Sequence, residues 1–133
     1  MSQSLDIFVD TDESLVGFVR ELESLLNIKF EMVTTDYETW YEFANSEIVA
    51  TVGGHDFEND CDIEFENYRY DIALRPINYE TAAEWQERRE KYANRIFDKL
   101  KATQRYQLLL VDNLQVKLAE FSPRFAVPII TTT

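Results

Sequence analysis

Hydrophobic and polar residues alternate along most of this chain, and only two stretches follow a helical repeat instead. Alternation with a period of two is typical of β-strands that bury one face. Apolar residues spaced three or four positions apart are typical of amphipathic helices. The helical repeat covers residues 12–26 and 81–101, and the alternation covers residues 5–10, 28–35, 37–43, 47–52, 61–66 continuing into 68–75, 106–111 and 114–121.

These elements come in the order β-α-β-β-β-β-α-β-β, with short connections between most of the strands. Short connections favour antiparallel pairing. We therefore expect an α+β, two-layer sandwich, in which a mostly antiparallel sheet of about six or seven strands carries two helices on one face. The first strand could still pair in parallel with the strand after the first helix, through a right-handed crossover. Residues 1–121 would form one domain and residues 122–133 a loosely held tail.

Both predicted helices begin with residues that have the spacing of a capping box. Asp10 is followed three positions later by Glu13, and Thr81 by Glu84. In a capping box the first side chain and the acid three residues later satisfy free N–H groups of the first turn. We therefore expect Asp10 and Thr81 to cap the two helices.

The start of the first helix also carries a motif known from an enzyme family. Asp10-Thr11-Asp12 follows an apolar strand and resembles the motif of haloacid dehalogenase phosphotransferases. That resemblance implies a nucleophilic Asp10, a general acid or base at Asp12, and Mg²⁺ bound nearby. The Gly-Thr that usually follows is Glu13-Ser14 here, and no second acidic pair for magnesium matches. Helix capping is therefore the preferred interpretation.

Composition and charge narrow the classes of function. The chain has 133 residues, with 25 acidic and 13 basic side chains and a formal net charge of −12, which argues against a DNA-binding protein. One Cys and one His exclude a disulfide framework and an all-protein Cys/His zinc site. The first residues have no signal-peptide pattern, and no apolar run approaches the length of a membrane span. We therefore expect a cytoplasmic protein that does not contact membranes.

The acidic residues are unevenly placed. Before Glu80 lie 18 of the 25 acidic residues but only four of the 13 basic ones. Six acids occupy every second position of one predicted strand, which would place them on one face: Asp56, Glu58, Asp60, Asp62, Glu64 and Glu66. This face is interpreted either as a solvated outer surface that discourages edge-to-edge pairing, or as a docking surface for a basic protein.

Other candidates for chemistry give weaker signals. Cys61 falls on the apolar side of its predicted strand, where a thiol usually behaves as a small hydrophobe. His55 follows Gly53-Gly54 and is predicted to lie in an exposed turn, so a catalytic pair with Cys61 is not favoured. The acidic run lacks the spacing of an EF-hand. We predict no catalytic residues, no metal site and no cofactor.

The leading interpretation is a small acidic, non-enzymatic protein-binding module that docks a basic partner through the six carboxylates. Immunity proteins of bacterial toxin systems, and other small inhibitors of basic enzymes, are similar in size and charge. A first alternative is a small-molecule or haem-type ligand binder, or an enzyme, with an aromatic pocket. That pocket would be built from Tyr37, Trp40, Tyr41, Tyr68, Tyr70 and His55. A second alternative is a structural homodimer that pairs through a strand edge or through residues 127–133.

Overall fold

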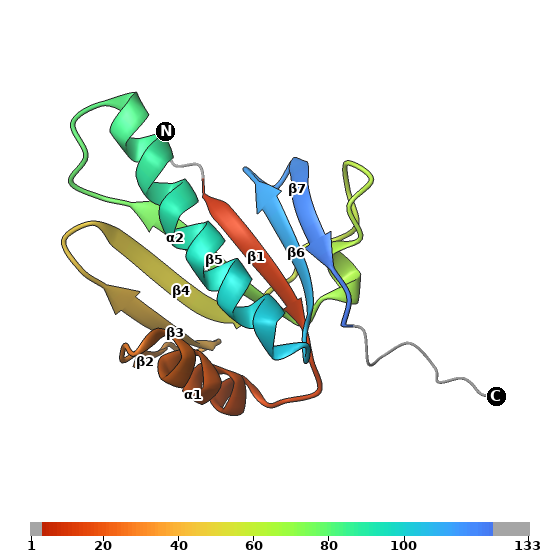
Figure 1. The fold of residues 1–133 in the computed structure, drawn as a ribbon. Helices are drawn as coiled ribbons and strands as arrows, with labels where there is room; N and C mark the ends of the chain where they lie inside the picture. The colour runs from red at the N-terminus through yellow and green to blue at the C-terminus, as the bar shows by residue number, and fades with distance from the viewer. Residues whose placement is uncertain (1–3, 124–133) are drawn as a thin grey trace.

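A computed structural model describes residues 4–123 and confirms the predicted α+β sandwich and its order of elements (Figure 1). Seven strands form one sheet in the order β2-β3-β4-β5-β1-β6-β7, and every neighbouring pair is antiparallel. The elements are β1 (Leu5–Asp10), α1 (Leu15–Leu26), β2 (Glu31–Thr34), β3 (Thr39–Ala44), β4 (Ile48–Gly54), the 3-10 helix η1 (Phe65–Asn67), β5 (Tyr70–Pro76), α2 (Ala82–Thr103), β6 (Gln107–Asp112) and β7 (Val116–Phe121).

The first strand lies in the middle of the sheet. β1 pairs with β5 on one side and with β6 on the other, so that Leu5 lies opposite both Leu74 and Asp112. After α1 the chain forms β2 at one edge of the sheet, and β2, β3, β4 and β5 then follow as neighbouring strands. The expected alternative of a parallel pair between β1 and the strand after α1 is therefore wrong, because three strands separate them.

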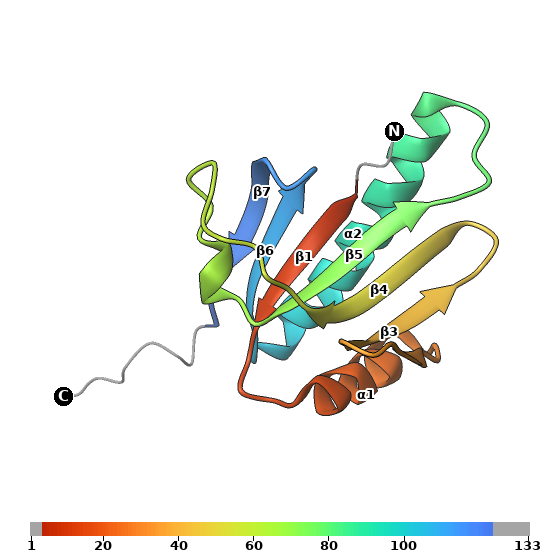
Figure 2. The same ribbon diagram turned by 180° about the vertical axis from the view of Figure 1, so that it is seen from behind.

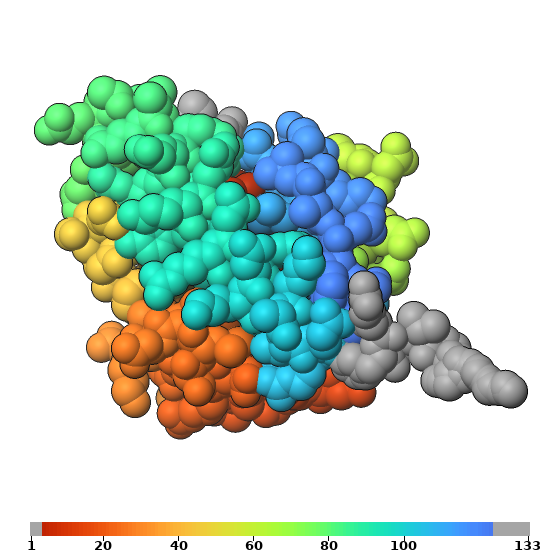
Figure 3. Space-filling model, viewed as in Figure 1, coloured from red at the N-terminus to blue at the C-terminus, as the bar shows by residue number. Residues whose placement is uncertain are grey.

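Both helices cover the same face of the sheet, as predicted (Figures 1 and 3). α1 turns Phe18, Val19 and Leu22 toward the strands, and α2 turns Ile96 and Leu100 toward them. Together with alternate residues of β1, β4, β5 and β6 they form the main hydrophobic core. Among the described residues no α-helix lies on the opposite face, which is here called the helix-free face and which the segment between β4 and β5 crosses (Figure 2).

The predicted N-cap is confirmed at α2 and is wrong at α1. Thr81 caps α2, because its hydroxyl accepts a hydrogen bond of 3.0 Å from the N–H of Glu84. α1 begins three residues later than predicted, and its cap is Ser14, whose Oγ accepts from the N–H of Gly17 at 3.1 Å. The predicted cap at Asp10 is wrong, because that residue still belongs to β1.

The largest departure from the sequence analysis concerns the segment 55–69, here called the acidic loop. The predicted strand at 61–66 is absent from the described structure. Instead the chain reverses at Cys61 and Asp62, which both adopt positive φ, and Asp60 and Ile63 exchange backbone hydrogen bonds across this turn. One turn of 3-10 helix then leads into β5. Cys61 is consequently exposed, not buried as predicted.

The predicted tail lies almost wholly outside the described residues. The structure describes nothing beyond Pro123, so neither the tail nor a dimer contact through residues 127–133 is placed. Among the described residues, no helix is long and apolar enough to cross a membrane.

Candidate functional site

The acidic loop is held on the helix-free face of the sheet by apolar side chains. Ile63, Phe65 and Tyr68 are buried against Phe8 of β1 and Leu109 of β6, which form a second hydrophobic core on this face. The rings of Phe8 and Phe65 are 4.9 Å apart. The alternating apolar residues that predict a strand therefore serve as anchors for a loop that lies across the sheet.

His55 fastens the beginning of this loop. Its Nε2 lies 2.7 Å from the carbonyl oxygen of Tyr68, and its Nδ1 accepts a hydrogen bond of 3.1 Å from the N–H of Phe57. These partners assign the proton to Nε2, because the carbonyl can only accept. The ring also stacks on Phe57 and meets Phe8 edge-on. His55 is therefore a structural residue of the loop, and it does not lie in a free turn.

The six alternating acids are all exposed, but they do not share one strand face. Three of them shape the loop by accepting hydrogen bonds: Asp60 from the N–H of Cys61 at 2.9 Å, Glu64 from the Nδ2 of Asn67 at 2.8 Å, and Glu66 from the N–H of Asn59 at 3.1 Å.

The other three acids, Asp56, Glu58 and Asp62, make no hydrogen bond or ion pair through their carboxylates within residues 4–123. None of the six is ion-paired with a described base. Lys117 of β7 lies near Glu64, but it binds Glu120 at 2.9 Å. The basic residues of α2 are on the opposite face of the sheet (Figures 1 and 2). The loop thus presents negative charge that the described part of the protein does not neutralise.

Two further carboxyl groups lie on the sheet beside the loop. Asp6 of β1 is opposite Ala73, and Asp71 of β5 is opposite Phe8, so the two aspartates are diagonal neighbours on the helix-free face. Asp6 is only 2% exposed, and Ser4 donates a hydrogen bond to it. Burial raises the pKa of Asp6, and it raises the pKa of Asp71 well above its usual range.

The environment of Asp71 explains this shift. Its Oδ1 is enclosed by the protein and receives no hydrogen bond from a fixed donor among the described residues. The nearby carboxyl of Asp6 supplies a partner once one of the two groups is protonated, and its negative charge also favours the protonated form of Asp71. Burial and the proximity of the two carboxyl groups therefore both favour retention of a proton by this pair.

Asp71 also forms part of a hollow of about 640 Å³ on this face. The hollow lies between the β2–β3 turn and the beginning of the acidic loop. Tyr37 and Glu38 contribute from the turn, and Asp56 and Phe57 from the loop. Tyr37 is 94% exposed and Phe57 is 37% exposed, so both rings are open to solvent at the hollow. Aromatic rings and carboxylates thus surround one depression.

The six residues of the predicted aromatic pocket are not brought together. Tyr37 and His55 line the hollow, whereas Tyr41 and Tyr70 turn to the helix-covered core. Tyr70 stacks on Phe18 there and donates a hydrogen bond of 2.6 Å to the carbonyl oxygen of Glu13. Tyr68 is buried at the end of the acidic loop, and Trp40 of β3 lies against Gly53 on the helix-free face. These side chains occupy both faces of the sheet, so they form no common pocket.

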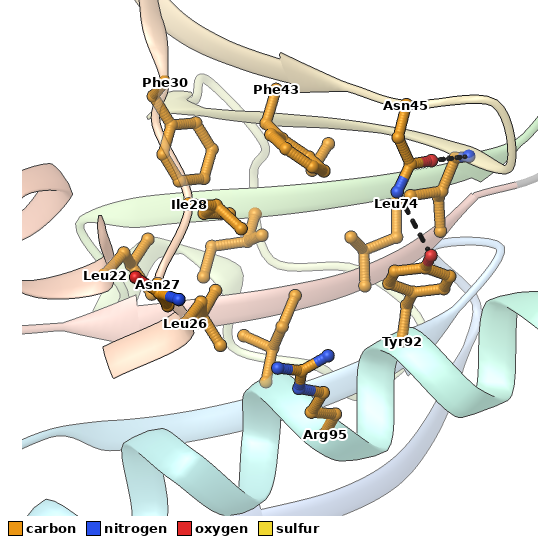
Figure 4. Close-up of a pocket in the computed structure, with 14 residues that line it drawn as sticks. Leu22, Leu26, Asn27, Ile28, Phe30, Phe43, Asn45, Leu74, Tyr92 and Arg95 are labelled. Atoms are coloured by element: carbon orange, nitrogen blue, oxygen red, sulfur yellow. Dashed lines mark hydrogen bonds between the residues drawn. The ribbon is translucent and has the colours of Figure 1, made fainter. Parts of the chain in front are cut away.

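A second cavity, which the sequence analysis missed, lies on the helix-covered face (Figure 4). It has a volume of about 270 Å³ and lies between α1, α2 and the strands β3 to β5. Phe30 and Phe43 form one wall, and Tyr92 and Arg95 reach it from α2 (Figure 4). No sequence signal marks this cavity, because its residues have the ordinary spacing of core positions.

Comparisons of the chain with protein-family models, curated proteins and solved structures found no match in any of the three. Within the part of the chain that the structure describes, no group of three or more His, Cys, Asp or Glu residues is arranged to hold a metal ion.

Proposed function

We propose that this chain is a non-enzymatic protein-binding module that docks a basic partner on the helix-free face of its sheet. The observation that carries this proposal is the hollow between Tyr37 and Phe57, which the exposed acids Glu38 and Asp56 also line. A lysine or arginine side chain of the partner fits such a place, because rings and carboxylates both attract cations. The proposed module has the size and charge of inhibitors and immunity proteins that act on basic proteins.

The acidic loop extends the same surface. Asp56, Glu58 and Asp62 are exposed and unpaired among the described residues, so they remain available to a partner's cations. Charges of this kind mainly accelerate association and select a partner of opposite charge. The loop is already ordered by its apolar anchors, so docking does not require it to fold.

The test begins with capture of binding proteins from the source organism's lysate and continues with the purified partner. We expect a basic partner whose Kd rises by at least about tenfold between 50 and 300 mM NaCl, because several exposed charges are screened. The triple variant Asp56→Lys, Glu58→Lys and Asp62→Lys should weaken binding by about 100-fold or more. It leaves intact the three acids that hold the loop together.

A matched control reverses three acids on the exposed side of α2, Glu87, Glu90 and Asp98. It changes the net charge equally but acts on the other face, so its Kd should stay within about threefold of the parent. Equal losses in the two triple variants would show that net charge alone matters and would overturn the docking surface. A partner that binds equally well at both salt concentrations would overturn the electrostatic basis.

The hollow is tested separately with Tyr37→Ala, which we expect to weaken binding by about tenfold. Tyr79→Ala is its control, because Tyr79 is another exposed tyrosine that packs on Trp85 of α2, away from the hollow. Unchanged affinity in Tyr37→Ala would remove the hollow from the docking surface, even if the loop variants lose binding.

A further inference from the structure

The cavity on the helix-covered face has the composition of a small-molecule site. Fourteen residues line it, and thirteen of them are uncharged. The floor consists of strand residues that include Ala50, Ile72 and Leu74, and the sides come from both helices. Ligand cavities in proteins are mostly apolar with a few placed polar groups. This cavity follows that pattern and is separate from the docking surface, which lies on the other face.

The cavity lies between the two helices and the strands beneath them. α1 ends at Leu26, and Asn27 takes a left-handed conformation that turns the chain toward Phe30. Ala50 is the smallest side chain at the floor, so it does not fill the space between the helices. Phe30 and Phe43, with ring centres 6.1 Å apart, close the cavity on the side of β3.

The polar groups of the cavity are not equivalent. The hydroxyl of Tyr92 is already satisfied, since it accepts from Asn45 Nδ2 at 3.2 Å and donates to Glu47 at 2.6 Å. Arg95 is the only charged lining residue, and within residues 4–123 it forms no hydrogen bond or ion pair. Figure 4 shows its guanidinium group beside the cavity, on the side of Leu26 and Asn27.

We propose that this cavity binds a small amphiphilic carboxylate, such as a medium-chain fatty acid, with its apolar body between the helices and its carboxylate on Arg95. The apolar lining accepts an aliphatic chain, and a guanidinium is the side chain best suited to a carboxylate because it can donate two parallel hydrogen bonds. An acidic ligand is selected here in spite of the negative net charge, because Arg95, the one charged residue among the described lining residues, is positive.

The test is calorimetric titration of the full chain with octanoate, octan-1-ol and octylamine. We expect octanoate to bind most tightly, octan-1-ol at least about tenfold more weakly, and octylamine most weakly, because Arg95 attracts one head group and repels another. Methyl NMR signals of Leu22, Ile28 and Ile96 should shift on titration with octanoate. Octanoate that binds no more tightly than octan-1-ol, or that leaves these methyl signals unchanged, would overturn the proposal.

Two variants identify the cavity as the site. Arg95→Gln should weaken the binding of octanoate by about tenfold and leave the affinity for octan-1-ol unchanged, because only the carboxylate of octanoate interacts with the charge of Arg95. Lys99→Gln is the matched control, because it removes one exposed charge from the same helix one turn further on and does not line the cavity. Equal effects of the two substitutions would overturn the role of Arg95. Ala50→Leu adds side-chain volume at the floor of the cavity and should weaken the binding of both ligands.

Discussion

At the scale of single residues, the buried carboxyl groups of Asp6 and Asp71 destabilise the protein when they ionise. Two carboxyl groups that share a partly enclosed place on a sheet cannot both ionise without loss of stability. Burial raises the pKa of Asp71 well above that of an aspartate in the unfolded chain. The folded state therefore retains a proton that the unfolded state releases, and stability falls as the pH rises from the unfolded pKa toward the folded one.

Asp71→Asn should consequently stabilise the protein at pH 8, by about 1–2 kcal/mol, because the amide resembles the protonated acid and can donate to Asp6. Near pH 4 the substitution should have little effect, since the native Asp71 then carries its proton. Urea unfolding of both proteins at a series of pH values measures this difference. The control is Asp62→Asn, whose carboxylate is exposed and should leave the free energy of unfolding within about 0.5 kcal/mol of the parent. A pH-independent difference for Asp71→Asn would contradict the shared proton.

At the scale of elements, the sequence predicts every strand and both helices but mistakes the acidic loop for a strand. Alternation of apolar and polar residues indicates only that every second side chain is buried. It does not show that the backbone pairs with a neighbouring strand, and Ile63 and Phe65 are buried here without such pairing. Cys61 and Asp62 decide the outcome by adopting positive φ, for which neither residue gives the strong signal of a glycine. The diagonal pair Asp6 and Asp71 was equally out of reach, because it depends on the register between two distant strands.

Phe65→Ala tests how the loop is held. Phe65 is 2% exposed and packs on Phe8, so its truncation should lower the free energy of unfolding by about 3 kcal/mol. The amide groups of the acidic loop should lose protection from hydrogen exchange more than those of β4 and β5. Phe57→Ala, at a partly exposed ring of the same loop, should cost about 1 kcal/mol or less. Unchanged exchange of the loop in Phe65→Ala would show that the hydrogen bonds of His55 and Glu66 suffice to hold it.

At the scale of the whole molecule, the charge is distributed unevenly between the two faces of the sheet. The acidic loop lies on one side of the sheet, and six of the 13 basic residues belong to α2 on the other (Figures 1 and 2). Several of those bases are already paired with acids, for example Arg88 with Glu84 at 3.0 Å and Arg89 with Asp112 at 2.8 Å. The unpaired acids of the loop repel one another, and this repulsion lowers the stability of the isolated protein.

Salt should therefore stabilise the protein. We expect the melting temperature to rise by about 3–5 °C between 20 and 300 mM NaCl, which corresponds to about 1 kcal/mol for a chain of this size. The triple variant Asp56→Asn, Glu58→Asn and Asp62→Asn should show a smaller rise, because it has lost three of the repelling charges. Differential scanning calorimetry measures both effects. A melting temperature that falls with salt would mean that screening of the ion pairs outweighs relief of the repulsion.

The central place of β1 has a consequence for how the chain reaches its native state. Leu5 pairs with Leu74 of β5 on one side and with Asp112 of β6 on the other. The ribosome therefore synthesises this apolar strand long before it synthesises either neighbouring strand. Sheets built from such distant pairs fold slowly, and an unpaired apolar strand invites aggregation meanwhile. The acids that follow it in the first 79 residues give the growing chain a strong negative charge during this interval. Mutual repulsion between nascent chains would oppose their aggregation until β6 has been synthesised.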